Sequence, residues 1–196
     1  MSGEDVEGGW EDRWRDFHRP VRAGPFWIGP PWEHPPEDAV PIVIDPGRAF
    51  GTGAHPSTRL CVEALAELEP GSLLDVGCGS GVLAIAAAML GFAPVGAVDI
   101  EAAAVEATAD NAAANGVSVT VRHADALAHR LDRTDVVVAN ISLAAVERLA
   151  PLVECRRLVT AGYLERERPA LEGFAHDRRC ALDGWAADVW SRAAPS

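Results

Sequence analysis

The feature that most constrains the fold is the stretch LLDVGCGSGVLAIAAA, residues 73–88. A short apolar run is stopped by Gly77, Gly79 and Gly81, and a segment rich in alanine and leucine follows directly. The glycines let the backbone turn sharply and approach a ligand closely, because they carry no Cβ. The stretch predicts a buried parallel strand, a ligand-binding loop and a helix. Open α/β sheets bind ligands at this place, the carboxyl end of a strand.

Apolar strands and helical segments alternate along the chain from Pro41 onward. We expect strands at residues 72–76, 93–99, 118–123, 135–140, 157–164, 178–182 and 185–191. We expect helices at residues 56–70, 81–90, 102–115, 142–154 and 166–173. This alternation predicts an α/β fold. Its seven-stranded sheet should be mostly parallel, with an antiparallel last strand and helices on both faces.

The N-terminal stretch differs in composition from the rest of the chain. Residues 1–40 hold four of the six tryptophans, and residues 20–46 hold eight of the fourteen prolines. Proline fixes φ and removes a backbone donor, so this stretch should be extended and irregular. Its aromatic residues suggest that it packs on the domain. We therefore expect an N-terminal extension, residues 1–40, lying on one domain formed by residues 41–196.

Charge and composition narrow the classes of function. The net charge is −12, with 17 arginines, no lysine and no basic run. Phosphate contacts by basic residues dominate nucleic-acid affinity, so we expect no nucleic-acid partner. No apolar run approaches the roughly 18 residues of a membrane span, and the N-terminus lacks signal-peptide chemistry, so we expect a cytoplasmic protein. The cysteines form no CxxC pair and the histidines lack ligand spacing, so we expect no metal site.

Three acidic residues lie at or just after the ends of three of the expected strands. Asp75 precedes the glycine loop, where a carboxylate would repel a pyrophosphate but suits a cationic ligand or a bond that holds the loop. Asp99 ends the second strand and can accept hydrogen bonds from both ribose hydroxyls. Asp125 follows the third strand and is placed to meet an adenine edge, although a solvated loop acid is the alternative. Asn140 after the fourth strand completes a row at one edge of the sheet.

A second glycine-rich stretch, IDPGRAFGTGAHPSTRLC, spans residues 44–61. A loop that opens a helix presents free N–H groups, which can hold the carboxylate of a ligand or shape the mouth of a pocket. Thr58 would add a hydroxyl in the first helical turn. His55 could act as a base, but a lone loop histidine more often makes structural hydrogen bonds.

These two stretches, together with GAVDI and DVVVANI, resemble the PrmA-type ribosomal protein methyltransferases over about residues 10–192. The resemblance implies a Rossmann-like class I methyltransferase fold and S-adenosylmethionine (SAM) as cofactor. It also implies methylation of amino groups in a lysine-rich protein of the large ribosomal subunit. Carried over by position, the cofactor contacts of the family fall on Thr58, Gly77, Asp99 and Asn140. In the family, Asn140 lies close to both the cofactor and the acceptor amine.

We therefore expect Asn140 to position the acceptor, with no obligatory general base and no metal. The complete set of expected cofactor-binding residues is Thr58, Asp75, Gly77, Gly79, Gly81, Asp99, Ile100, Asp125 and Asn140. Tyr163, the one tyrosine of the chain, would either line the acceptor pocket or belong to the core.

The chain departs from the family pattern in two places. We expect it to lack the separate N-terminal recognition domain, and the segment before residue 164 is shorter and has no Pro-Gly-Gly turn. A methyltransferase for a small molecule or a peptide is therefore an alternative to a protein methyltransferase. A non-catalytic SAM-binding partner subunit and an NAD-dependent oxidoreductase are further alternatives. The oligomeric state is open.

Overall fold

The computed structural model describes residues 19–47 and 51–193, which form a sandwich of helices around a central sheet. The described part of this sheet has seven strands in the order β6-β5-β4-β7-β8-β10-β9. The strands are β4 (Leu73–Val76), β5 (Val95–Asp99), β6 (Thr120–His123), β7 (Val136–Asn140), β8 (Arg157–Leu164), β9 (Phe174–Leu182) and β10 (Trp185–Arg192).

The direction of the strands confirms the expected class I methyltransferase fold. Strands β4 to β8 pair in parallel, while β10 is antiparallel to both of its neighbours. The last strand reverses because a two-residue turn, Asp183-Gly184, joins it to β9. Both turn residues have positive φ, 50° and 79°. Such Asp-Gly turns match the twist of a β-hairpin.

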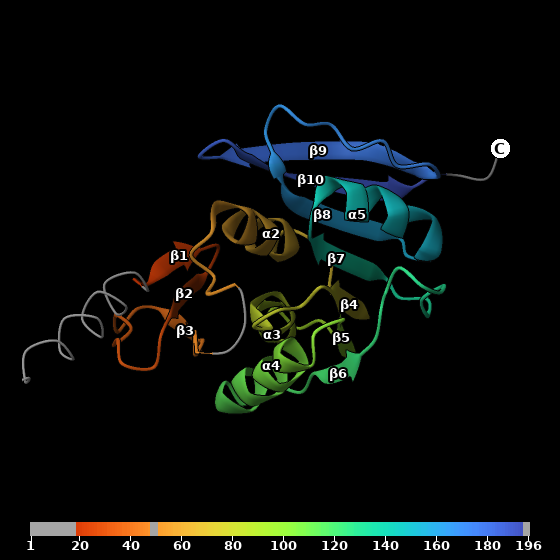
Figure 1. Cartoon of the computed structure of the whole chain (residues 1–196). Helices are drawn as coiled ribbons and strands as arrows, with labels where there is room; N and C mark the ends of the chain where they lie inside the picture. Colours follow the sequence, from red (N-terminus) through yellow and green to blue (C-terminus); the bar gives the residue numbers. More distant parts are fainter. Residues whose placement is uncertain (1–18, 48–50, 194–196) are drawn as a thin grey trace, which may run out of the picture.

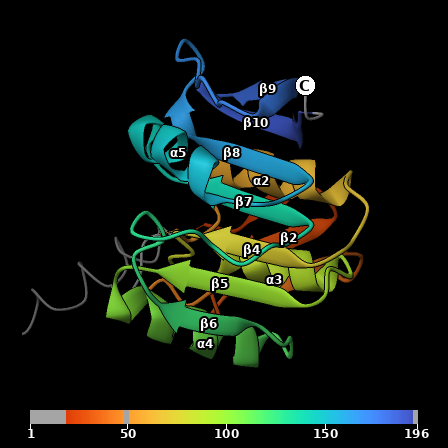
Figure 2. The same ribbon diagram turned by 90° about the vertical axis from the view of Figure 1, so that its right-hand side faces the viewer.

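Helices cover both faces of the sheet, as expected (Figures 1 and 2). Helices α2 (Pro56–Ala66), α3 (Val82–Met89) and α4 (Ala102–Ala114) lie on one face. Helix α5 (Leu143–Leu149) and the 3₁₀ turn η1 (Ala150–Leu152) lie on the other. Residues 82–87 of α3 are all buried. The small alanine side chains of this helix let it pack closely between the sheet and its neighbours.

Three of the expected helices differ from the structure. The helix expected at 56–70 ends as α2 at Ala66. Residues 166–173 form turns and no helix, and Glu167 instead accepts a hydrogen bond from the Leu164 N–H at 2.6 Å. Pro169 interrupts this stretch, and its charged residues offer no apolar helix face. The helix expected at 142–154 ends as α5 at Leu149 and continues only as the short η1, which contains Pro151.

The N-terminal stretch is extended and partly irregular, as expected, but it also contains short strands. Strands β1 (Val21–Ala23), β2 (Phe26–Gly29) and β3 (Val40–Val43) form a small sheet, antiparallel between β1 and β2 and parallel between β2 and β3. The prolines do not prevent this because Pro25 lies in a turn and Pro41 lies in β3, an edge strand. Trp10 and Trp14 lie outside the described residues.

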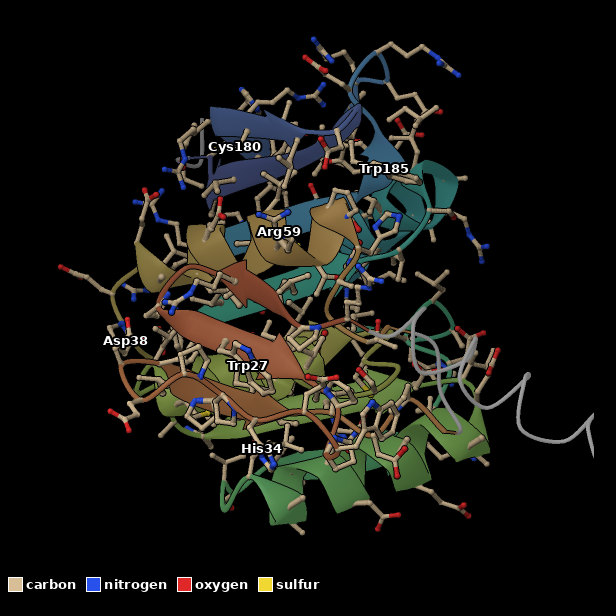
Figure 3. All side chains as sticks on the ribbon, turned by 90° about the vertical axis from the view of Figure 1, so that its left-hand side faces the viewer. Trp27, His34, Asp38, Arg59, Cys180 and Trp185 are labelled. Atoms are coloured by element: carbon tan, nitrogen blue, oxygen red, sulfur yellow. The ribbon has the colours of Figure 1, made fainter. Side chains whose placement is uncertain are left out.

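This small sheet packs on the helical face that carries α2, α3 and α4 (Figure 3). Ala23, Phe26, Ile28, Ile42 and Ile44 join the same apolar core as residues of α2 and α3. The side chain of Asn115 also pairs with the backbone of Val43, accepting at 2.8 Å and donating at 2.7 Å. The small sheet is thus fixed to the domain by buried side chains and by hydrogen bonds.

The described residues hold no membrane-spanning helix, no cluster of metal-ligating side chains and no disulfide. No described helix combines the length and apolar character needed to cross a bilayer. No cluster of three or more His, Cys, Asp or Glu side chains in the described ranges could hold a metal ion. The four cysteines carry free thiols, and three of them are buried.

Candidate active site

A cavity of about 590 Å³ opens at the carboxyl edge of the parallel strands. This volume falls within the usual range of small-molecule sites. The cavity is lined by the glycine loop after β4, the ends of β5 and β7, the start of α2 and the first residue of β10. It therefore lies where ligands bind in open α/β sheets.

The structure brings six of the nine expected site residues to this cavity. They are Thr58, Gly77, Gly79, Asp99, Ile100 and Asn140. Asp75, Gly81 and Asp125 do not line it. Gly81 begins α3 with φ +83°, and a Cβ there would lie 2.8 Å from Cγ2 of Thr108. That glycine lets α3 approach α4.

The glycine loop is shaped by its contacts with β5 and with the segment after β7. Gly77 has φ +73°, and a Cβ on it would lie only 2.6 Å from Cγ2 of Ile141. The Gly77 N–H donates to the Val98 carbonyl at 2.9 Å. Only glycine fits this position, so the backbone of the loop forms one wall of the cavity.

Asp99 is held by backbone donors on both of its oxygens. Oδ2 accepts from the Gly79 N–H at 3.0 Å, and Oδ1 accepts from the Glu101 N–H at 2.9 Å. A carboxylate has about four acceptor positions, so each oxygen keeps capacity for a further donor. The side chain is thus fixed at the end of β5 as an acceptor that faces the cavity.

Asp125 does not line the cavity, but the turn that carries it is bonded to the backbone of Asp99. The preceding N–H, of Ala124, donates to the Asp99 carbonyl at 2.9 Å. The Asp125 carboxylate is exposed, and it accepts from the Leu127 N–H at 2.8 Å. The turn is therefore fixed to the end of β5.

Asp75 lies beneath the loop, with 1% of its surface exposed. Its Oδ2 accepts from the Ala84 N–H at 3.1 Å, while its Oδ1 has no hydrogen-bond partner among the described residues. Burial raises the pKa of this carboxyl from 3.8 to about 7. The nearby Asp99 charge also raises it, and the Ala84 bond opposes both. In this structure Asp75 supports the start of α3.

This buried carboxyl should make the stability of the fold depend on pH. A pKa raised in the folded state stabilises the protein below pH 4, and this contribution is lost as pH rises toward 7. The shift in the pKa of Asp75 corresponds to a change of roughly 4 kcal/mol in the free energy of unfolding. We expect Asp75→Asn, which keeps an acceptor for Ala84, to remove this dependence. Urea unfolding at pH 4 and pH 8 measures this dependence, with the exposed Asp110→Asn as control. If the free energies of unfolding of wild type and Asp75→Asn differ by the same amount at both pH values, the prediction is wrong.

The N–H groups in the first turn of α2 are paired within the chain. The ring Nδ1 of His55 accepts from the Ser57 N–H at 3.3 Å, and the His55 carbonyl accepts from Thr58 at 3.0 Å and Arg59 at 3.2 Å. His55 therefore caps the helix. Burial lowers its pKa, which favours the neutral ring at the cavity wall.

Asn140 and Thr58 meet across the cavity from β7 and α2. The amide Nδ2 of Asn140 donates to Oγ1 of Thr58 at 3.1 Å. This bond orients the amide and leaves its Oδ1 as the group that can accept from a substrate. The pair joins two residues that are 82 positions apart in the sequence.

Sequence reasoning missed several lining residues, including Glu101, Ile141, Ser142, Gly162 and Trp185. Gly162 carried a usable signal, because a glycine inside a strand often marks a close backbone approach. It has φ +99°, and a Cβ there would lie 2.8 Å from the carbonyl carbon of Ile141. Trp185 carried no such signal. Its ring packs edge-to-face against the His55 ring, with 4.4 Å between the ring centroids. This contact arises because β10 runs antiparallel to β8 and begins at the edge of the sheet where the cavity lies.

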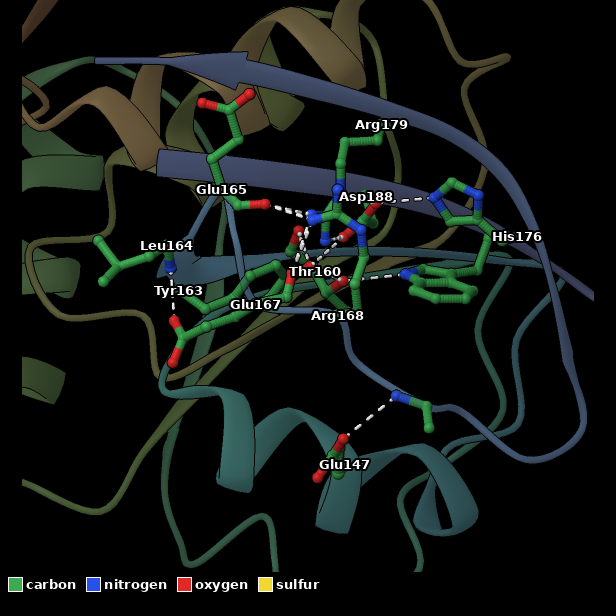
Figure 4. Close-up of polar contacts among 12 residues, drawn as sticks. Glu147, Thr160, Tyr163, Leu164, Glu165, Glu167, Arg168, His176, Arg179 and Asp188 are labelled. Carbon is green, nitrogen blue, oxygen red and sulfur yellow. Dashed lines mark hydrogen bonds and ion pairs between the residues drawn. The ribbon is translucent and has the colours of Figure 1, made fainter. Parts of the chain in front are cut away.

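Tyr163 lies in the core and does not line the cavity. Its hydroxyl donates to Oδ2 of Asp188 at 2.7 Å and lies 2.8 Å from Oγ1 of Thr160 (Figure 4). Asp188 is fully buried and also accepts from Arg179 at 2.7 and 2.9 Å and from His176 at 2.7 Å. These residues form a polar network inside the C-terminal strands.

The charges around the cavity favour a cationic ligand. Asp99 and Glu101 line it, and none of the described lining residues is a lysine or an arginine. A dinucleotide diphosphate would meet these two carboxylates. A ligand with a ribose and a positive centre, such as SAM, fits this set of residues.

Comparison with known proteins decides the family. A sequence profile described as "Ribosomal protein L11 methyltransferase (PrmA)" matches residues 3–166. The chain belongs to this family. The resemblance predicted from the two glycine-rich stretches is thereby confirmed. A family member from Legionella pneumophila is 40% identical over 199 aligned positions, which cover 93% of this chain and 68% of that protein.

Two further family members define the extent of the match. The one from Serratia proteamaculans is 45% identical over 157 residues, covering 74% of this chain and 52% of that protein. The chain thus spans about half to two thirds of the length of these relatives. A crystal structure described as the ribosomal protein L11 methylase of Lactobacillus delbrueckii subsp. bulgaricus has a TM-score of 0.77 and 30% identity. The match covers 89% of this chain and 99% of that one.

Proposed function

We propose that this chain is a SAM-dependent methyltransferase that methylates amino groups of a protein substrate, as the names of its relatives indicate for ribosomal protein L11. The observation that carries the proposal is the cavity itself. Asp99 and the Asn140–Thr58 pair line one cavity at the carboxyl edge of the sheet. A chain of this family with that edge intact has the parts needed to bind both SAM and an amine.

Named residues account for the binding of SAM. Asp99 would accept hydrogen bonds from the ribose hydroxyls, and Gly77 and Gly79 would admit the cofactor against the loop backbone. We propose that Asp125, on the turn fixed to β5, approaches the adenine edge. When bound, SAM supplies a methyl group on a positively charged sulfur.

The chain would act on the acceptor by attraction, orientation and exclusion of water. Asp99 and Glu101 would attract an ammonium group to the cavity, and this group would release one proton to solvent to become the neutral amine that attacks the methyl group. Asn140 Oδ1 would accept a hydrogen bond from the amine and fix its direction, and Trp185 would shield it from solvent. Proximity and orientation can supply most of the rate when the methyl donor is already activated.

The first test is calorimetric titration of the purified chain with SAM, S-adenosylhomocysteine and NAD. We expect dissociation constants near micromolar, about −8 kcal/mol, for the first two ligands and no binding of NAD. Methyl transfer is then measured on purified ribosomal protein L11 and on a panel of small amines and peptides. If methyl groups are transferred only to the small amines or peptides, the substrate is a small molecule or a peptide and not a protein. Binding without any transfer would favour a non-catalytic SAM-binding subunit.

Asn140→Ala should separate acceptor positioning from cofactor binding. We expect kcat to fall by roughly 10²-fold, the usual cost of losing one well-placed polar group at a reacting centre. The affinity for S-adenosylhomocysteine should change much less. Thr58→Val, which removes only the partner of the amide, should give a smaller loss of kcat. If cofactor affinity falls as far as kcat, Asn140 is a cofactor contact and does not position the acceptor.

A further inference from the structure

A second cavity, of about 450 Å³, lies at the opposite edge of the sheet. It is formed by the loop before β7, the segment before β8 and the end of β10. β7 is five residues long, so the two cavities lie roughly 16 Å apart along the strands. This cavity is therefore separate from the candidate active site.

The lining of this second cavity is strongly basic in an acidic protein. It contains four arginines: Arg130, Arg133, Arg156 and Arg192. Among the described residues that line it, Glu154 is the acidic one. The chain as a whole has a net charge of −12 with 17 basic residues. A local excess of positive charge at a concave surface attracts anions.

Two of these arginines are held in place by neighbouring groups. The guanidinium of Arg192 stacks over the Phe174 ring at 4.3 Å and donates to the Val153 carbonyl. The guanidinium of Arg156 pairs with Asp135 at 3.1 Å. Arginines fixed in this way lose less side-chain entropy when an anion binds.

The other two arginines keep most of their donors for a ligand. Arg133 pairs with Glu154 at 3.7 Å, a long contact between side chains that are 77% and 60% exposed. Arg130 forms no ion pair or hydrogen bond within the described residues. Glu154 and Asp135 thus balance two of the four arginine charges, and a net charge of about +2 remains at the cavity.

We propose that this cavity binds a small phosphate-bearing anion of the diphosphate class. The planar fork of arginine matches phosphate oxygens in two-point hydrogen bonds. A diphosphate group has the charge to complement two unbalanced arginines and the size for a cavity of 450 Å³. The apolar parts of Pro151, Val153 and Ala193 complete the lining beside the charged groups.

Calorimetric titration of the full chain with inorganic pyrophosphate at constant ionic strength tests the proposal. We expect saturable binding that Arg130→Gln weakens at least ~10-fold, the effect of losing a charge-assisted hydrogen bond. Arg133→Gln should weaken it as well, so the test does not depend on one folded variant. Arg178→Gln is the matched control, because Arg178 pairs with Glu67 and does not line the cavity. This control should leave binding unchanged.

Three results would overturn the proposal. They are no saturable binding of pyrophosphate at millimolar concentration, equal weakening by Arg178→Gln, and binding of an RNA oligonucleotide or an acidic peptide but not of pyrophosphate. A parallel titration with S-adenosylhomocysteine shows whether each variant keeps its fold. Because the ligands differ, failure at this cavity and failure of the proposed methyltransferase function are distinguishable.

Discussion

Replacing Asp99 by alanine should weaken SAM binding by roughly 10²- to 10⁴-fold. Each hydrogen bond to a charged group contributes about 1.5–3 kcal/mol, and two bonds to the ribose would be lost. The structure adds a second cause. The same carboxylate also fixes the Gly79 and Glu101 N–H groups, so the loop that faces the cofactor would lose its support. Calorimetry with SAM and with S-adenosylhomocysteine measures the effect.

Asp110→Ala is the matched control for Asp99→Ala. It removes the same charge from an exposed position on α4 and does not touch the cavity. We expect it to change SAM affinity by less than about threefold, because exposed charges are screened by solvent. A similarly small change for Asp99→Ala would show that the ribose binds elsewhere.

Asp188→Ala should destabilise the fold more than any surface substitution. It would leave the Arg179 guanidinium, whose side chain is only 15% exposed, without its carboxylate. Breaking a buried, hydrogen-bonded ion pair by removing one partner costs about 3–5 kcal/mol. The melting temperature should fall by roughly 10 °C in a chain of this size. Arg179 also donates to the Glu165 and Glu167 carbonyls, so the loop after β8 should loosen as well.

Asp177→Ala provides the comparison for Asp188→Ala. Asp177 also pairs with an arginine, Arg157, at 2.6 Å, but those side chains are 34% and 44% exposed. The expected loss is at most about 1 kcal/mol. Equal losses for the two variants in thermal unfolding would refute the special role of the buried network.

The pH dependence of the Asp188 effect has a defined sign. Burial alone would raise the pKa of this carboxyl, but the bonds from Arg179, Tyr163 and His176 outweigh it and hold the pKa below the ordinary value. Its contribution to stability is therefore present above about pH 4 and is lost as pH falls through the folded pKa. Wild type and Asp188→Ala should converge in stability at strongly acidic pH.

The central sheet could be predicted from sequence because burial on both faces leaves continuous apolar runs. The expected strand at 157–164 coincides with β8, and the helix expected at 102–115 extends one residue beyond α4. The small N-terminal sheet could not be predicted in this way. Its strands are three or four residues long, and prolines surround them. Pairing between β2 and β3 across a ten-residue connection, residues 30–39, and packing on the domain core stabilise them instead.

In the candidate site, too, some residues could be predicted from local sequence and others depend on tertiary contacts. A strand end and a glycine loop fix the positions of Gly77, Gly79 and Asp99, so local sequence sufficed to bring them to one cavity. The helix expected at 166–173 was wrong because a local pattern was read without its tertiary partners. The expected antiparallel strand at 185–191 fixes the direction of the last hairpin, but no local pattern shows that its first side chain, Trp185, lines the cavity. Asp75 has the right residue type and spacing, but its side chain turns inward to Ala84.

The main-chain contact between Gly162 and Ile141 bears on how such a site can diversify. The Ile141 N–H donates to the Ala161 carbonyl at 3.0 Å, so backbone atoms hold the segment that carries Asn140. The Ser142 side chain makes no capping bond to α5 although it lines the cavity. A substitution at position 142 can therefore reshape the cavity wall next to Asn140 while the Asn140 amide stays in place. Selection for a new acceptor could act at this position without loss of the folded scaffold.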